Sequence, residues 1–97
     1  MEARVLTYAI PSAQIDAAVR LWNEKVLPGL RQQRGFGGGL VLTSAASGKA
    51  LVISLWQSEA DRNAYESTDE FKTLLADVQS VIEGSPTIEE YDVSIRE

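Results

Sequence analysis

The chain has 97 residues, nine of them basic and fourteen acidic, so its formal net charge is −5 at neutral pH. Because it contains neither histidine nor cysteine, we expect no zinc, haem or iron–sulfur site and no histidine-assisted nucleophile. The acidic balance without a Lys/Arg cluster argues against a nucleic-acid partner, and no apolar run approaches the ~18 residues of a membrane span.

The first half of the chain predicts a strand, a long helix and a hairpin. Residues 3–10 are rich in β-branched and aromatic side chains, which is typical of a strand. Helical spacing then relates apolar residues over 12–33, namely Ile15, Val19, Trp22, Val26 and Leu30. Because Pro28 lies inside this stripe, we expect the helix to kink or restart near Leu27. Residues 40–57 indicate two strands joined by a Ser-Gly turn.

The second half predicts two further helices and a closing strand. Ser58 is placed to cap a short helix that ends near residue 66. A second capping box, starting at Ser67, indicates a helix over residues 68–83. A last strand follows over 87–95. No linker separates these elements, so we expect a single domain over 1–97, and the lack of cysteine favours the cytoplasm.

The order β-α-β-β-α-β is typical of the ferredoxin-like α+β fold, with a four-stranded antiparallel sheet and two helices on one face. Strands 3–10 and 51–56 carry apolar residues on both sides, which indicates that both faces of the sheet are buried. Two helices cover only one face. We therefore expect a homodimer in which the sheet of a second copy covers the other face.

Four of the seven glycines lie within residues 35–39, in the stretch Gly-Phe-Gly-Gly-Gly. A dinucleotide-binding fingerprint is excluded, because its last glycine would fall on Leu40 and the segment follows a helix instead of a strand. Glycines inside an edge strand mark a bulge or the close approach of another backbone. We therefore interpret this stretch as a feature of assembly, which lets the strand curl or lets the chain of a partner subunit lie close.

Three segments, LPGLRQQRGFGGG, LVISLWQSEADRNAYESTDEF and IEEYDV, together resemble the antibiotic biosynthesis monooxygenase family. The resemblance implies a dimeric α+β barrel, in which two ferredoxin-like sheets close face to face. Family members usually have a Trp at the end of the third strand, then a His, a Ser and an aromatic residue. Here these positions hold Trp56, Tyr65, Thr68 and Phe71. Tyrosine in place of the histidine argues against the haem-degrading branch and leaves open the branches that oxidise quinols or anthrones without a cofactor.

A pocket in this fold would lie between the sheet and the helices of one subunit. We expect Trp56 and Tyr65 to be its catalytic residues, with Tyr65 as a hydrogen-bond donor, because an unperturbed tyrosine pKa near 10 makes a poor base at neutral pH. The expected substrate-binding residues are Trp22, Tyr8, Phe71 and Asn63. Simple core packing is the alternative for each aromatic side chain. We expect Arg62 to lie on a solvated helix surface. The alternative for Asn63 is the same solvated surface.

Three hypotheses remain at the level of sequence. The first is a monooxygenase that acts without cofactor or metal on a small aromatic, phenol or quinol substrate. The second is a binding or regulatory protein that holds a small aromatic ligand unchanged. The third is a structural dimer without a pocket.

Overall fold

Four antiparallel strands form one sheet in the computed structural model, which describes residues 1–97. The strands are β1 (Glu2–Ala9), β2 (Phe36–Ser44), β3 (Lys49–Trp56) and β4 (Glu83–Asp92). Their order across the sheet is β2-β3-β1-β4, so β1 and β3 lie in the centre. The expected ferredoxin-like α+β fold is confirmed.

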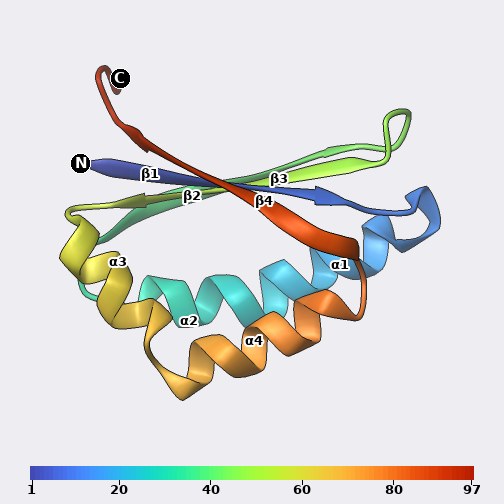
Figure 1. Cartoon of the computed structure of the whole chain (residues 1–97), viewed down its shortest axis with the longest axis horizontal. Helices are drawn as coiled ribbons and strands as arrows, with labels where there is room; N and C mark the ends of the chain where they lie inside the picture. Colours follow the sequence, from blue (N-terminus) through green and yellow to red (C-terminus); the bar gives the residue numbers. More distant parts are fainter.

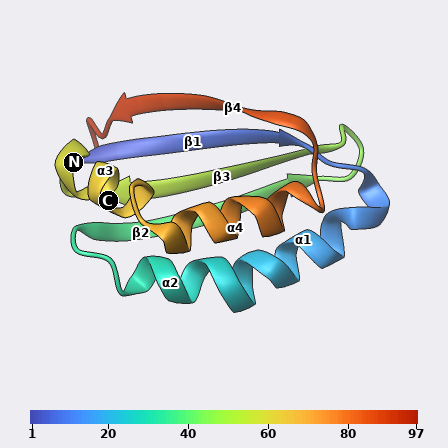
Figure 2. The ribbon, with the colours of Figure 1, turned by 60° about the horizontal axis from the view of Figure 1, so that its bottom comes forward.

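All helices lie against one face of this sheet (Figures 1 and 2). They are α1 (Ile15–Leu21), α2 (Leu27–Arg31), α3 (Glu59–Glu66) and α4 (Asp69–Gln79). A single 3₁₀ turn precedes α1, and a π-helical turn, Trp22–Val26, joins α1 to α2. The expected restart at Leu27 is therefore present, because α2 begins there with Pro28 in its first turn. No helix has the length and apolar character needed to cross a membrane.

Two predicted boundaries were wrong. The residue that caps α4 is Thr68, whose Oγ1 accepts a hydrogen bond from the backbone N–H of Phe71 at 3.1 Å. Ser67 instead belongs to the end of α3, where its Oγ donates to the carbonyl of Asn63 at 2.8 Å. At the other end, α4 stops at Gln79 and β4 already begins at Glu83, since the chain turns back early to pair with β1.

The glycine-rich stretch lies at the edge of the sheet, in β2, as expected. The pairing of β2 with β3 shifts register between Phe36 and Gly38, which marks a bulge. Gly38 has φ 120°, a backbone conformation that residues with a side chain rarely adopt. A Cβ on Gly39 would lie 2.9 Å from the carbonyl oxygen of Ile53, so the close approach is between neighbouring strands of this chain.

The two faces of the sheet differ in what covers them. On the helix side, two groups of buried residues form the core: Tyr8, Ile10, Ala18, Trp22, Ala50 and Val78 in one, and Leu30, Trp56 and Tyr65 in the other. No element of the chain covers the opposite side, which we call the open face (Figure 1). Its aliphatic residues include Val5, Leu40, Leu42, Leu51, Ile53 and Leu55. Leu40 and Leu42 are 60% and 48% exposed.

Candidate functional site

Two adjoining hollows lie between the sheet and the helices. The inner hollow has a volume of about 60 Å³ and is lined mainly by hydrophobic side chains. The outer hollow, about 260 Å³, lies between α4 and β4. They share seven lining residues, Arg4, Leu6, Tyr8, Glu66, Phe71, Leu75 and Val78, so they form one continuous cleft. The outer part approaches the range of about 300–1,000 Å³ that ligand sites usually have.

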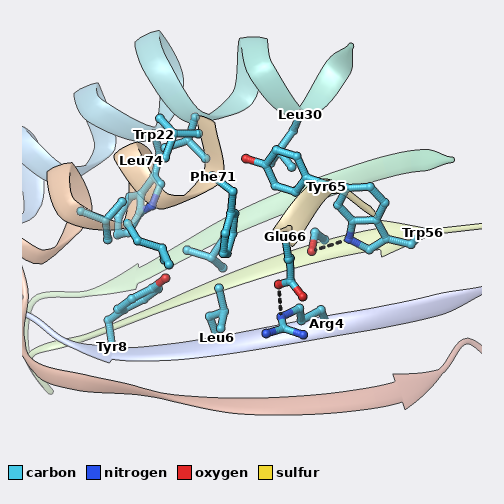
Figure 3. Close-up of a pocket in the computed structure, with 15 residues that line it drawn as sticks. Arg4, Leu6, Tyr8, Trp22, Leu30, Trp56, Tyr65, Glu66, Phe71 and Leu74 are labelled. Carbon is cyan, nitrogen blue, oxygen red and sulfur yellow. Dashed lines mark hydrogen bonds and ion pairs between the residues drawn. The ribbon is translucent and has the colours of Figure 1, made fainter. Parts of the chain in front are cut away.

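Aromatic rings from five elements, β1, the π-helical turn, β3, α3 and α4, surround the inner hollow (Figure 3). The rings of Trp56 and Tyr65 stack, with centroids 5.7 Å apart and an interplanar angle of 25°. Phe71 meets Tyr65 edge to face at 5.2 Å. On the far side, Tyr8 and Trp22 pack at 5.8 Å. Five of the six residues that the sequence suggested for the site are therefore brought to one cavity.

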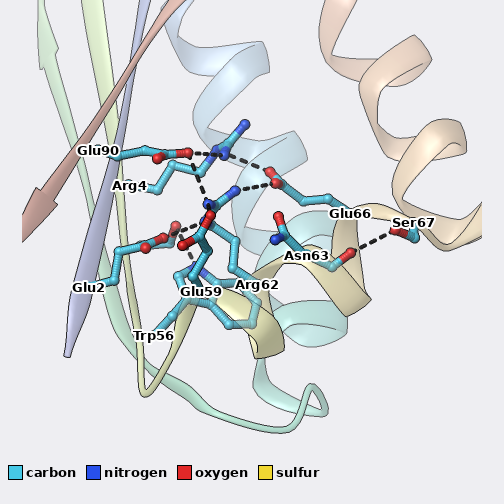
Figure 4. Close-up of polar contacts among 10 residues, drawn as sticks. Glu2, Arg4, Trp56, Glu59, Arg62, Asn63, Glu66, Ser67 and Glu90 are labelled. Carbon is cyan, nitrogen blue, oxygen red and sulfur yellow. Dashed lines mark hydrogen bonds and ion pairs between the residues drawn. The ribbon is translucent and has the colours of Figure 1, made fainter.

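The sixth residue, Asn63, is not brought there. It is exposed on α3 and does not line either hollow. Residues in an α-helix are about 100° apart around the axis, so Asn63 and Tyr65 differ by about 200° and face opposite sides. Because Tyr65 turns toward the cavity, Asn63 must turn toward solvent (Figure 4).

Thr68 connects the two aromatic residues of the α3–α4 junction. Its Oγ1 donates to the carbonyl of Tyr65 at 2.7 Å and accepts from the backbone N–H of Phe71 at 3.1 Å. One hydroxyl thus ends α3 and begins α4, and it fixes the backbone on both sides of the Tyr65–Phe71 contact. The spacing Tyr-x-x-Thr-x-x-Phe is therefore the local device that places both rings beside the cavity.

The tyrosine hydroxyls of the cleft are neutral donors at neutral pH. Burial raises the pKa of Tyr8 to about 12, although the Arg4 cation works against this shift. The pKa of Tyr65 is also raised to about 12, first by burial and then by the carboxylates of Glu70 and Glu66. Neither hydroxyl hydrogen-bonds within the chain, whereas Trp56 Nε1 donates to Ser54 Oγ at 3.0 Å. Two buried phenol donors are therefore free to bind a ligand.

A network of ion pairs adjoins the cleft through two of the residues that line it, Arg4 and Glu66 (Figure 4). The expectation that Arg62 is solvated was wrong, since it is only 3% exposed. Its Nη1 donates to Glu66 Oε1 at 2.7 Å, its Nη2 lies 2.9 Å from Glu90 Oε1, and its Nε donates to Glu2. Arg62 reaches these carboxylates because it projects from α3 toward the sheet. Glu2 lies there at the start of β1, and Glu90 lies near the end of β4.

Sequence reasoning did not identify Arg4 and Glu66 as residues of the cleft. Arg4 Nε lies 3.0 Å from Glu66 Oε2, and both side chains line both hollows. A signal was present for Arg4, because it shares a strand face with Leu6 and Tyr8 and is the charged residue next to them in that alternation. Elsewhere, the acidic side chains form no group of three or more that could hold a metal ion.

No protein-family model and no curated protein matches the chain by sequence. The fold does match solved structures. One is an antibiotic biosynthesis monooxygenase, with a TM-score of 0.78, 19% identity and coverage of 98% of this chain and 100% of the other. A monooxygenase from Streptomyces coelicolor, solved in complex with nanaomycin D, has a TM-score of 0.81 at 18% identity and covers 99% and 89% of the two chains.

A third match is a cofactor-independent oxygenase from Streptomyces nogalater, with a TM-score of 0.82, 9% identity and coverage of 98% of this chain and 94% of the other. At these identities the likeness establishes the fold. The chain thus has the fold of the antibiotic biosynthesis monooxygenases, as the sequence resemblance implied.

Proposed function

We propose that the protein is a cofactor-independent monooxygenase that acts on a small phenol- or quinol-type aromatic substrate in the cleft between its sheet and its helices. One observation carries the proposal: aromatic rings surround a cavity into which two phenol donors, Tyr8 and Tyr65, bring hydroxyls without partners in the chain. Solved structures of the same fold include a cofactor-independent oxygenase and a monooxygenase in complex with nanaomycin D, which supports the reaction class.

The chemistry needs no external reductant. A phenol of this kind can react as its keto tautomer, in which the carbon to be oxidised is a ring CH₂ group. When this group reacts with O₂, one oxygen atom becomes the new carbonyl and the other leaves as water, so the substrate supplies all four electrons. The substrate releases a proton to solvent water, and the protein's part is to stabilise the electron-rich anion that remains. Tyr65 donates a hydrogen bond to the substrate oxygen, and the stacked ring of Trp56 holds Tyr65 and walls off water. Removal of water strengthens that hydrogen bond.

The test is oxygen uptake by the purified protein with a panel of anthrones and quinols. Replacement of Tyr65 by Phe removes one donor and keeps the ring, so we expect kcat/KM to fall by about 100-fold. Tyr91→Phe is the matched control, because Tyr91 is 51% exposed on β4 and does not line the cleft. Turnover that is no faster than in the Tyr65→Phe variant, for every substrate in the panel, would refute the proposal.

A second candidate function is the binding of a small aromatic ligand without turnover. It is favoured by Tyr65 itself, because a tyrosine with a pKa of about 12 cannot act as the base that a histidine supplies. Native mass spectrometry of the protein as purified distinguishes the two. A ligand that is retained unchanged in air supports binding alone, whereas an oxygenated product supports the oxygenase.

We further propose that the protein acts as a homodimer, in which the open face of one sheet packs against the open face of the other. Partly exposed aliphatic side chains such as Leu40 and Leu42 would each gain a part of the roughly 1.5–3 kcal/mol that full burial of such a side chain contributes. Only ten of the 97 residues are buried within one chain, so little core stabilises the isolated subunit. We expect an interface of about 2,000 Å² or more in total.

A further inference from the structure

We infer that Arg4 and Glu66 form a pair that recognises a hydroxyl group on the ligand, so that the cleft selects neutral hydroxylated aromatics over aromatic carboxylates. This inference rests on the proposed function in that both concern the same cleft. It goes further because it assigns a specificity to two residues outside the aromatic wall.

The placement of the pair comes first. Arg4 and Glu66 are the charged residues that line both the inner and the outer hollow. Their side chains are 13% and 17% exposed, so the charges are largely removed from water. Figure 3 shows the carboxylate of Glu66 between the aromatic rings and the guanidinium of Arg4. A ligand that spans both hollows therefore passes this pair.

The hydrogen-bonding capacity of the pair is only partly used. Glu66 Oε1 accepts a hydrogen bond from Arg62, and the only partner of Oε2 within the chain is the ion-paired guanidinium of Arg4. Although Arg4 Nε lies 3.0 Å from that Oε2, it is buried and makes no hydrogen bond. Of the five N–H groups of Arg4, only one on Nη1 donates, to Glu90 at 3.3 Å. A carboxylate oxygen with spare acceptor capacity thus lies beside N–H groups that have no acceptor, and a hydroxyl can bond to both.

The local charge explains the selection against anions. Arg4 and Arg62 contribute two positive charges, whereas Glu2, Glu66 and Glu90 contribute three negative charges. A ligand carboxylate beside Glu66 would add a like charge in a site that is poorly screened by water. A neutral hydroxyl adds no charge, since it donates to Glu66 Oε2 and accepts from Arg4.

The experiment compares three ligands with the same ring system, 1-naphthol, 1-naphthoate and naphthalene, by NMR titration in buffer free of oxygen. We expect the wild-type protein to bind 1-naphthol about tenfold more tightly than either of the others. Equal affinity for 1-naphthol and naphthalene would show that the hydroxyl is not recognised. Affinity for 1-naphthoate equal to or above that for 1-naphthol, or no binding of 1-naphthol at millimolar concentration, would also overturn the inference.

Glu66→Gln tests the residue, because it keeps the size of the side chain and removes its charge. We expect the preference for 1-naphthol over 1-naphthoate to fall by about tenfold, with naphthalene binding unchanged. The matched control is Glu59→Gln, since Glu59 is 68% exposed and lies at the rim of the same network, 3.9 Å from Arg62. An equal change in both variants overturns the inference. Selective binding of 1-naphthol without any oxygen uptake upholds it and removes only the oxygenase proposal.

Discussion

The two faces of the sheet are built from the same strands, yet they carry different chemistry. The helix-covered face holds aromatic rings, two free phenol hydroxyls and two arginines, Arg4 and Arg62, that are each paired with carboxylates. The open face holds aliphatic side chains, and no element of the chain covers it. Because side chains alternate along a strand, each strand serves both faces at once.

If the protein binds a ligand in the cleft and dimerises through the open face, as we propose, this difference separates ligand binding from assembly. A polar or aromatic group is useful in a cleft because it recognises a ligand, but aliphatic residues with few polar groups are what a second sheet packs against. Substitutions on one face should therefore leave the function of the other largely intact. The predictions below test this separation, from the largest expected effect to the smallest.

Leu40→Glu should break the dimer. Leu40 lies opposite Ile53 on the open face and is 60% exposed in one chain, so the subunit itself tolerates the change. In a dimer, each copy would bury an unpaired carboxylate at a cost of several kcal/mol, so the dissociation constant should rise by about 1,000-fold or more. Sedimentation measures this shift.

The control is Val19→Glu, an equally large change at a 43% exposed site on α1. A wild-type protein that sediments as a 10.6 kDa monomer at micromolar concentration would refute the dimer.

Arg62→Ala should produce the largest loss of stability on the covered face. The substitution leaves the carboxylates of Glu2 and Glu66, 15% and 17% exposed, without their shared cation. Breaking a buried ion pair in this way costs about 3–5 kcal/mol. Arg34→Ala, which removes a 97% exposed side chain 4.0 Å from Asp61, should cost less than about 1 kcal/mol. Urea unfolding at one protein concentration measures both, and equal losses would contradict a structural role for the network.

Most of the fold could be predicted from the sequence, because hydrophobic periodicity is a local property of the chain. The restart at Leu27 and the bulge in β2 also followed from single residues, Pro28 and the glycines. The errors lay at the ends of elements. Ser67 and Thr68 are both suitable caps, and only the backbone geometry decides between them.

The aromatic part of the site was predictable in the same way, since strand alternation and helical phase place Tyr8, Trp22 and Trp56 on inward faces. The charged part was not. Arg62 and Glu66 resemble an ordinary surface pair at helical spacing. The second partner of Arg62, Glu2, is 60 positions away from it in the sequence. Contacts over such separations depend on the packing of α3 against β1, which no local pattern encodes.

Alkaline pH should lower the stability of the protein through the tyrosines of the covered face and not through Tyr91 on the other face. For each tyrosine, this is the smallest of the three expected effects. Tyr8 and Tyr65 have a pKa of about 12 in the folded protein, against 10.0 when unperturbed. Between pH 10 and 12 the unfolded chain has lost these protons while the folded protein keeps them. The unfolded state then binds fewer protons, so the free energy of unfolding falls as pH rises. The contribution is fully present below pH 10 and is lost by about pH 12.

A shift of two pKa units corresponds to about 2–3 kcal/mol for each tyrosine. Urea unfolding at a series of alkaline pH values should therefore show a steep loss in the wild-type protein and a shallower loss in Tyr8→Phe and Tyr65→Phe. The contrast is Tyr91, which is 51% exposed on the side of β4 away from the helices. Its pKa is raised mainly by the hydrogen bond to Glu89 and not by burial within the chain, so Tyr91→Phe should change the slope least. If Tyr91→Phe flattened the curve as much as Tyr65→Phe, burial on the covered face would not be the cause of the raised pKa values, and the phenols of the cleft would be open to water.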